Sequence, residues 1–285
     1  MMVARIGRFA FSEFPLAYRI AHDFVIIHPS RHAMLVSCIT VTQPGREALL
    51  QLAISDFLRQ THSRRELLII HDGGAAFDAR LRAMAAVDAR VRVAGTPERR
   101  TLGALRNFAV ERARGELVCQ WDDDDRFHPL RLESQLAALE SAGSDVCFLS
   151  DQLHWFADTR ELAWDDWHTE AYPMNFVQGT LLARRDRLPR YPELPRGEDT
   201  GLVYALFEAG RSITRLRGVG WCYVYVCHGR NAFDHAHHAA ISRMKAMSAA
   251  RVLAAERVLR ERIAGYEPPI GPATLFYKGG KIELP

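Results

Sequence analysis

From residue 34 to about residue 150, short apolar segments alternate with segments of helical periodicity. The apolar segments are rich in β-branched residues or end at turn residues, which is typical of buried strands. They cover residues 34–41, 66–74, 90–95, 116–121 and 145–150. Apolar residues at helical spacing predict helices over 46–60, 101–115 and 129–143. This alternation predicts an α/β fold with a parallel sheet.

The pattern is less regular after residue 150. Strands are predicted over 176–186 and 220–227, and between them a loop enters a helix that ends at Gly210. An Arg-rich amphipathic helix is expected over 241–263. A chain of 285 residues fits one large α/β domain with appendages. The expected parts are an N-terminal extension, a main domain and a C-terminal helical extension over 1–33, 34–231 and 232–285.

Charge and cysteine usage exclude several classes of protein. The net charge of +3 is too small to indicate nucleic-acid binding. The five cysteines form no C-x-x-C pair, which favours a reducing compartment. No apolar run approaches the ~18 residues of a membrane span, and the N-terminus lacks the continuous apolar segment of a signal peptide. We therefore expect a cytoplasmic protein.

Four consecutive aspartates, Asp122–Asp125, follow the strand predicted over 116–121. Crowded carboxylates repel one another and raise each other's pKa, so such a run needs an explanation. Alternate residues of an extended segment point the same way, so Asp122 and Asp124 can converge on one hard cation, Mg²⁺ or Mn²⁺. The alternative is a solvated loop whose carboxylates cap the next helix. That alternative suits Asp125, but four aspartates are a costly cap, which favours a cation site for the whole run.

Four stretches of the chain then occur in a recognisable order: SCITVTQPGREALLQLAISDFLRQTHSRRELLIIHDGG, TLGALRNFAVERARGELVCQWDDDDRFHPLRLESQL, QGTLLARRD and RGEDTGL. Together they resemble family-2 glycosyltransferases of the GT-A fold, over residues 34–231. The resemblance implies a Rossmann-like, mixed but mostly parallel sheet flanked by helices, followed here by the C-terminal amphipathic helix. It also implies a nucleotide-diphosphate sugar donor held by residues 34–128 and a glycan or lipid-linked acceptor held by residues 129–231.

Roles for single residues follow in part from the resemblance and in part from the type and position of each residue. The donor is expected to contact Thr42, Asp72, Arg106, Asp122 and Asp123. A Mn²⁺ or Mg²⁺ ion on the donor diphosphate is expected at Asp122 and Asp124, with His228 as a third ligand. Asp199 of the GED stretch is expected to be the catalytic base of an inverting transfer. The acceptor is expected to contact Trp155, Trp167, Gly179, Thr180 and Glu198.

The chemistry of glycosyl transfer supports two separate carboxylate groups. The acceptor hydroxyl must lose a proton as it attacks, which a positioned carboxylate can accept. The leaving diphosphate gains negative charge, which a divalent ion offsets. The alternative for Glu198 and Asp199 is a pair of first-turn acids favoured by the helix dipole.

Several candidates keep structural alternatives. His228 is equally suited to a hydrogen bond at a strand end. Arg106 can reach a phosphate or pack on the edge of the sheet. Of the three tryptophans, which are Trp155, Trp164 and Trp167, we expect one to contact the acceptor and the others to fill the core.

The sequence departs from the family pattern twice. His71 stands where the second strand usually ends in an acidic residue, and the first loop reads VTQPGR, which leaves the donor contacts of residues 43–46 undefined. Two other functions compete with sugar transfer. A nucleotidyltransferase would bind its nucleotide and its metal ion at the same ends of the strands. It would, however, need a Gly- and basic-rich phosphate loop after the first strand, which VTQPGREA does not provide. A catalytically silent nucleotide-sugar-binding module would not need Asp199.

The predicted C-terminal helix carries an aliphatic stripe of Val252, Ala255, Leu259 and Ile263 flanked by arginines. A basic amphipathic helix of this kind can lie on an anionic membrane surface. It can equally pack on its own domain or on a second subunit as a homodimer contact. The stripe has no aromatic residue, which favours packing against protein over peripheral membrane contact.

Overall fold

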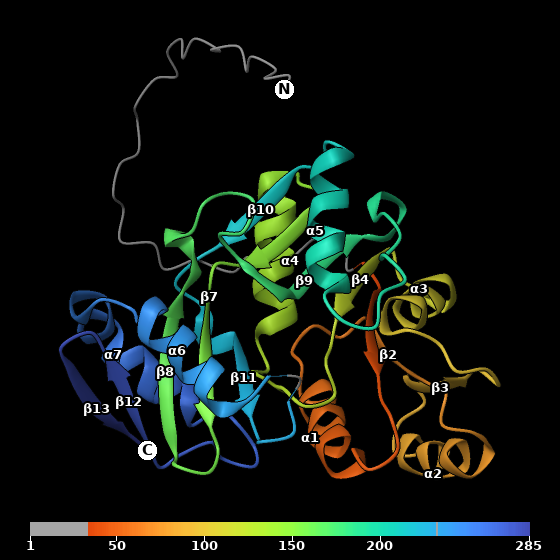
Figure 1. Cartoon of the computed structure of the whole chain (residues 1–285), viewed down its shortest axis with the longest axis horizontal. Coiled ribbons are helices and arrows are strands. Elements are labelled where there is room, and N and C mark those ends of the chain that lie inside the picture. The colour runs from red at the N-terminus through yellow and green to blue at the C-terminus, as the bar shows by residue number, and fades with distance from the viewer. Residues whose placement is uncertain (1–33, 232) are drawn as a thin grey trace, which may run out of the picture.

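The computed structural model describes residues 34–231 and 233–285, and the predicted N-terminal extension lies outside the described residues. The chain forms two sheets with helices packed around them (Figure 1). The first sheet contains, in spatial order, β10 (Ile213–Leu216), β6 (Val146–Leu149), β9 (Val177–Arg184), β4 (Leu117–Gln120), β1 (Val36–Val41), β2 (Arg65–His71) and β3 (Val91–Gly95). The second contains β13 (Gly280–Leu284), β12 (Ala273–Tyr277), β8 (Glu161–Asp166), β7 (Asp151–Phe156), β11 (Tyr223–Cys227) and β5 (Arg126–Phe127).

The first sheet confirms the predicted mixed but mostly parallel architecture. β3, β2, β1 and β4 run parallel to one another, and so do β6 and β10. β9 is antiparallel to both of its neighbours and joins the two parallel groups. β1 and β2 are buried along almost their whole length, because helices cover both faces of the sheet. Every strand predicted between residues 34 and 150 is present.

The helices follow the predictions with two differences. The predicted helices appear as α1 (Glu47–Leu58), α3 (Leu102–Arg112), α4 (Arg131–Ala142) and α5 (Glu198–Glu208). A further helix, α2 (Ala75–Ala85), was not predicted, and it buries only one narrow stripe, Phe77, Leu81 and Ala85. α4 begins at Arg131 rather than at Pro129, since the His128 amide and the Pro129 carbonyl are bonded to Cys222 and Thr61. It ends as expected at Gly143, which adopts a left-handed conformation (φ 60°).

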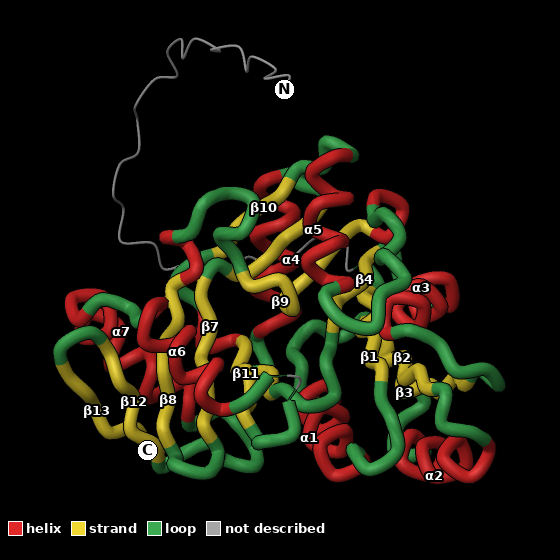
Figure 2. Tube along the Cα trace, in the orientation of Figure 1, coloured by secondary structure: helices red, strands yellow, loops and turns green. Residues whose placement is uncertain are grey.

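The prediction of one continuous C-terminal helix was wrong. The segment forms two helices, α6 (His235–Lys245) and α7 (Ala249–Ile263), separated at Ala246–Ser248. Met247 causes the break, because it is buried and its amide donates to the carbonyl of Trp164 on β8 (2.8 Å). The residues after 232 also do more than form helices, since β12 pairs with β8 and extends the second sheet. Figure 2 shows these last strands beside β8.

The aliphatic stripe of α7 packs against its own chain. Val252, Leu259 and Ile263 are essentially inaccessible to solvent and belong to the main hydrophobic core. This arrangement is the protein packing that the lack of aromatic residues favoured. Among the described residues, no helix is long and apolar enough to cross a membrane.

Candidate active site

The aspartate run connects the two sheets. β4 of the first sheet ends at Gln120 and β5 of the second begins at Arg126, so Asp122–Asp125 lie at the junction. Just before the run, Trp121 is fully buried and stacks on Phe127 with ring centroids 3.9 Å apart. The run of carboxylates therefore begins directly after a residue whose position is fixed by packing.

The chain is also anchored immediately after the run. The Arg126 guanidinium donates to both oxygens of the buried Asp56 carboxylate, at 2.7 Å and 3.1 Å. The Phe127 amide donates to the same carboxylate at 2.9 Å. Because Asp56 lies on α1, this bidentate pair ties the start of the second sheet to a helix of the first.

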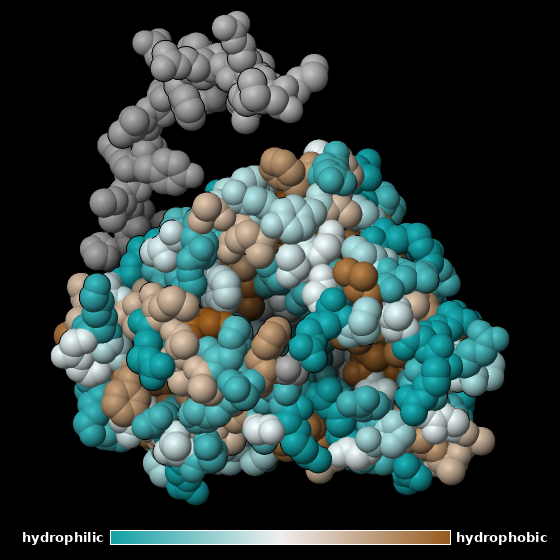
Figure 3. Space-filling view, in the orientation of Figure 1, coloured by the Kyte–Doolittle hydropathy of each residue, from teal (hydrophilic) through white to brown (hydrophobic). Residues whose placement is uncertain are grey.

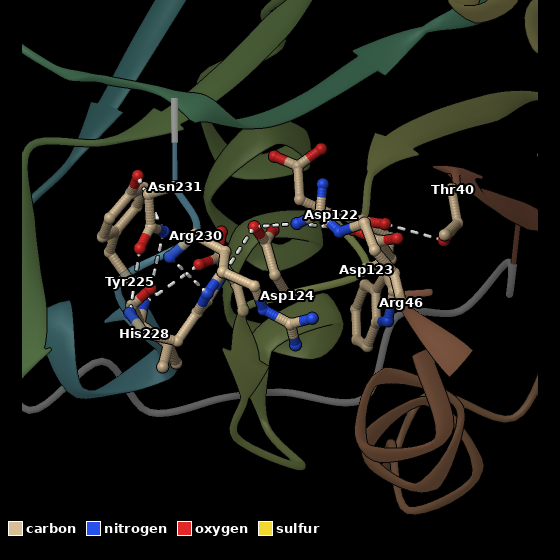
Figure 4. A network of polar contacts seen from close by, with 12 residues as sticks. Thr40, Arg46, Asp122, Asp123, Asp124, Tyr225, His228, Arg230 and Asn231 are labelled. Atoms are coloured by element: carbon tan, nitrogen blue, oxygen red, sulfur yellow. Dashed lines mark hydrogen bonds and ion pairs between the residues drawn. The ribbon is translucent and has the colours of Figure 1, made fainter. Parts of the chain in front are cut away.

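Each aspartate of the run has at least one polar partner, and Asp123 and Asp124 share Arg46. Asp122 accepts from Arg106 at 2.9 Å and from Gln120 at 2.9 Å. Asp123 pairs with Arg46 at 3.2 Å. Asp124 pairs with Arg46 and with His228 Nε2, the latter at 3.2 Å. Asp125 accepts from the Tyr223 hydroxyl and from the Val226 amide. The run is thus a buried polar junction rather than a solvated loop (Figure 4).

The carboxyl groups of Asp123, Asp124 and Asp125 differ in pKa because their surroundings differ. Burial, followed by the charge of Asp124, raises the pKa of Asp123 to about 7. Burial and the Asp124 charge also raise the pKa of Asp125. Burial acts in the same direction on Asp124, but the bond to His228 and the Arg46 charge prevail and lower its pKa. Asp124 is therefore the member of this trio that is held as a carboxylate.

Asp124 and His228 form a pair suited to a divalent cation. Two ligands at about 2.1 Å from a metal and at right angles to each other lie about 3 Å apart, and Asp124 Oδ2 and His228 Nε2 are 3.2 Å apart. The Arg230 amide donates to His228 Nδ1 at 3.2 Å. The imidazole proton therefore sits on Nε2, facing Asp124, and a metal at Nε2 would displace it.

The predicted Asp122–Asp124 pair does not share a partner, because Asp122 is bonded to Arg106 and Gln120. Within residues 34–231 and 233–285, no three His, Cys, Asp or Glu side chains gather into a metal-binding group. Two protein ligands nevertheless fit Mg²⁺ or Mn²⁺, which commonly keep waters and take substrate phosphates as further ligands.

Arg106 links the aspartate run to the start of α5. It is buried, and it donates through Nη2 to Asp122 (2.9 Å) and through Nε to Glu198 (2.8 Å). Glu198 is buried as well, and burial raises its pKa although Arg106 opposes the shift. Arg106 thus forms an internal ion pair that neither of its two predicted alternatives included, and its contact with the donor stays a prediction.

Asp199 differs from its neighbour Glu198. Its side chain is partly exposed, and its Oδ1 accepts from the Thr200 amide at 2.7 Å. Among the described residues, no Lys, Arg or His forms an ion pair with Asp199. Gly197 precedes the pair in a left-handed conformation (φ 75°) that favours glycine. The start of α5 thus anchors one carboxylate and leaves the next one accessible.

The donor-side candidates follow the ends of β1 and β2. Thr42 is buried beside the aspartate run, and its amide donates to the Ile70 carbonyl at 2.9 Å. Asp72 pairs with Arg99 at 3.2 Å and accepts from the Arg100 amide at 3.0 Å. His71 is buried and its Nε2 lies 3.0 Å from Asp78 of α2. His71 therefore fixes α2 against the sheet and leaves Asp72 as the acidic side chain at this strand end.

The acceptor-side candidates fall into two groups. Gly179 lies beside the aspartate run, because a Cβ at this position would be 3.5 Å from Asp122 Oδ2. Thr180 is fully buried, and its hydroxyl donates to the Val177 carbonyl and accepts from the Leu149 amide. Its side chain thus stabilises the irregular pairing of β6 and β9 and is not exposed to solvent.

Trp155 and Trp164 lie in β7 and β8 of the second sheet, and Trp167 directly follows β8. Trp164 is buried and donates to Asp151 at 2.7 Å, so it fills the core, as expected for some of the three. Trp155 and Trp167 are partly buried and pack against that core. Trp167 also has the Lys245 ammonium 5.2 Å from its ring centroid.

Sequence reasoning missed three polar residues of this site. Arg46 lies in the loop after β1 and contacts both Asp123 and Asp124. Asn107 donates to the Tyr191 carbonyl and accepts from the Tyr191 amide, which holds the segment before α5 against α3. Gln120 orients Asp122. Their partners are 2 to 84 residues away in the chain, so most of these contacts have no local sequence signal.

Solved structures with a similar fold include a mannosyltransferase and a protein in complex with a nucleotide sugar. S. aureus TarS 1–349 in complex with UDP-GlcNAc is 17% identical, with a TM-score of 0.57 over 82% of this chain and 68% of that chain. Mannosyltransferase PcManGT from Pyrobaculum calidifontis, in complex with GDP-Man and Mn²⁺, is 15% identical, with a TM-score of 0.54 over 83% of this chain and 73% of that chain. At this level of identity the likeness establishes the fold, which is of the GT-A type.

The sequence establishes the family. Residues 37–187 match the family described as glycosyl transferase family 2, and since they make up more than half of the chain, it belongs to that family. The O-antigen biosynthesis glycosyltransferase WbnJ of Escherichia coli is 36% identical over 86 residues, which are 30% of this chain and 34% of that protein. The match thus spans about a third of this relative's length.

Proposed function

We propose that this protein is an inverting, metal-dependent glycosyltransferase that moves a sugar from a nucleotide-diphosphate donor to an acceptor hydroxyl. The observation that carries the proposal is one polar junction with two chemically different ends. At one end, Asp124 and His228 are 3.2 Å apart and suit a divalent cation. At the other end, Asp199 is accessible and lies next to Glu198. Arg106 donates hydrogen bonds to both Glu198 and Asp122.

The proposed transfer is a single displacement. Asp199 accepts the proton of the acceptor hydroxyl as the acceptor oxygen bonds to the anomeric carbon. The bond between that carbon and the diphosphate oxygen breaks, and its electron pair leaves with the nucleoside diphosphate. Attack and departure on opposite faces of the sugar invert the anomeric configuration. Family membership and the GDP-Man and UDP-GlcNAc complexes of similar structures support this assignment of the reaction.

Residues on the donor side have separate proposed tasks. Asp124 and His228 would hold Mn²⁺ or Mg²⁺, which offsets the charge that develops on the leaving diphosphate. Asp72 and Thr42, at the ends of β2 and β1, would contact the nucleoside. Asp122 and Gly179 lie together and would border the sugar, and the small glycine leaves space for it. We assign Trp155 or Trp167 to the acceptor, and the similarity to WbnJ suggests an acceptor in cell-surface glycan synthesis.

The test is a donor screen with product analysis. UDP- and GDP-sugars are incubated with the protein and glycan acceptors in the presence of Mn²⁺, Mg²⁺ or a chelator, and nucleoside diphosphate release is measured. We expect release that the chelator abolishes and that Asp199→Asn suppresses, whereas the exposed control Asp186→Asn retains activity. Equal release with chelator would contradict the metal role. Tight donor binding with no turnover on any acceptor would favour the silent binding module.

A further inference from the structure

The two faces of the second sheet are covered differently. On one face, α7 packs over Leu162, Trp164 and Leu275 in the main core. On the other, α6 covers β7 and β8, where Phe156, Ala163 and Ala239 form a small separate cluster. In Figure 1, α6 lies across β7 and β8, with β12 and β13 to its left. Among the described residues, no helix covers the face of β12 beside α6, where Phe276 remains partly exposed.

A cavity of about 670 Å³ lies in this place. Its apolar lining comes mainly from the sheet and from α6, and includes Phe156, Ala163, Ala239, Met244, Phe276 and Tyr277. Met244 and Phe276 are among the exposed large apolar side chains, at 75% and 41% exposure. The volume falls within the range of about 300–1,000 Å³ that small-molecule sites occupy. Figure 3 shows apolar surface mixed with hydrophilic surface on this side of the molecule.

The rim of the cavity is cationic. The whole chain has only three lysines, Lys245, Lys278 and Lys281. Lys245 and Lys278 line the cavity with Arg243, and Lys281 is the cross-strand partner of Phe276. A chain that otherwise uses arginine thus has two of its three lysines in the lining of this cavity, and the third lies opposite a lining residue on the neighbouring strand.

Two of these cations lack an internal partner. Lys245 pairs with Glu170, and the lining carboxylate of Asp166 pairs with Arg217 at 2.6 Å. In the part of the chain that the structure describes, neither Arg243 nor Lys278 forms an ion pair with an acidic residue. Glu161 is the remaining lining carboxylate, and it accepts from the Thr159 hydroxyl. Among the described residues, the rim charges without an ionic partner are therefore two cations, Arg243 and Lys278, and one carboxylate, Glu161, which leaves a net positive charge.

We propose that this cavity binds a single-chain amphiphile with an anionic head, of the alkyl phosphate class. The apolar tail would lie between α6 and β12, where it covers Phe276 and Met244 and removes their surface from water. The phosphate would sit at the rim with Lys278 and Arg243, whose charges suit a phosphate. The site is separate from the aspartate junction and does not depend on the proposed transferase activity.

The test uses the full-length chain and dodecyl phosphate below its critical micelle concentration, with binding measured by calorimetry. We expect saturable one-to-one binding. Dodecyl maltoside should bind at least about tenfold more weakly, because it has the tail without the charge, and inorganic phosphate should show no saturable binding at the same concentrations. Anionic and neutral phospholipid vesicles form a separate arm.

The variants locate the site. Lys278→Glu and Met244→Glu change exposed residues and should each weaken binding of dodecyl phosphate at least about tenfold, while Ala239→Phe should block the cavity. Arg257→Glu and Leu253→Glu are the matched controls on the exposed surface of α7. They likewise replace a cation and an apolar residue with glutamate, and they should retain the wild-type affinity. The proposal is overturned if Lys278→Glu binds like the wild type, if inorganic phosphate binds as tightly, or if only anionic vesicles bind.

Discussion

Two arginines hold the aspartate junction, and they differ in how firmly they are bound. Arg106 joins Asp122 to Glu198, and its side chain is only 6% exposed. Arg46 joins Asp123 to Asp124, and its side chain is 25% exposed. Arg106 projects from a packed helix, whereas Arg46 lies in the turn between β1 and α1. Both arginines form ion pairs with carboxylates. The Arg106 pairs form a fixed support, whereas the Arg46 pairs are partly open to solvent.

This difference indicates which contact can change during a reaction cycle. A buried ion pair that loses one partner leaves a charge without compensation, which is strongly destabilising. A partly exposed arginine can return to water at small cost. We infer that Arg46 occupies the place of a cation beside Asp124 until a metal arrives, and that Arg106 keeps its position throughout.

The largest effect is expected at the fixed end, where Arg106 and Glu198 hold the start of α5. Asp199→Asn keeps the shape of the side chain and removes its basicity. It should lower kcat by about 10²–10⁴-fold and leave donor affinity unchanged. Steady-state kinetics and donor calorimetry check this, and near-normal kcat would place the base elsewhere.

Removing the fixed arginine should mainly cost stability. Arg106→Gln leaves the buried carboxylate of Glu198 and the partly buried carboxylate of Asp122 without their cation, and it should lower the unfolding free energy by about 3–5 kcal/mol. Urea denaturation measures the change. The double variant Arg106→Gln with Glu198→Gln should recover part of the loss, and no recovery would mean that the pair is not the source.

Removing Arg46, the partly exposed arginine, should cost little stability and should mainly change metal binding. Arg46→Gln should lower the unfolding free energy by no more than about 1 kcal/mol. In the absence of donor, it should raise Mn²⁺ affinity several-fold, because the metal no longer competes with the guanidinium. Calorimetry or Mn²⁺ electron paramagnetic resonance reports this directly. Unchanged or weaker metal binding would show that Arg46 does not occupy the cation position.

The smallest effect is a pH dependence at Asp123. Burial raises its pKa from 3.8 to about 7, so between these values the folded state retains a proton that the unfolded chain releases. The contribution of this group to the unfolding free energy is therefore fully present below about pH 4 and is lost as the pH rises to about 7. Asp123→Asn should flatten this slope relative to the wild type in metal-free urea titrations. Parallel slopes would contradict the raised pKa.

Much of the fold could be predicted because its signals are local. The strands at β1, β2 and β4 are short apolar runs, and each helix predicted before residue 150 buries apolar residues at helical spacing. The C-terminal prediction failed where local periodicity was misleading. Apolar spacing continues from α6 into α7, but Met247 is bonded to β8, and this tertiary contact interrupts the helix.

The sequence by itself determined the α/β fold, the position of Asp122–Asp125 at a strand end, and Asp199 as an acid at the start of a helix. These features depend on residues close together in the chain. Only the tertiary structure decided how the four carboxylates are divided among partners. Arg46 is 78 residues from Asp124, and Glu198 is 92 residues from Arg106. The pairing of Asp124 with His228, across 104 residues, exists because the junction of the two sheets places the end of β11 beside the aspartate run.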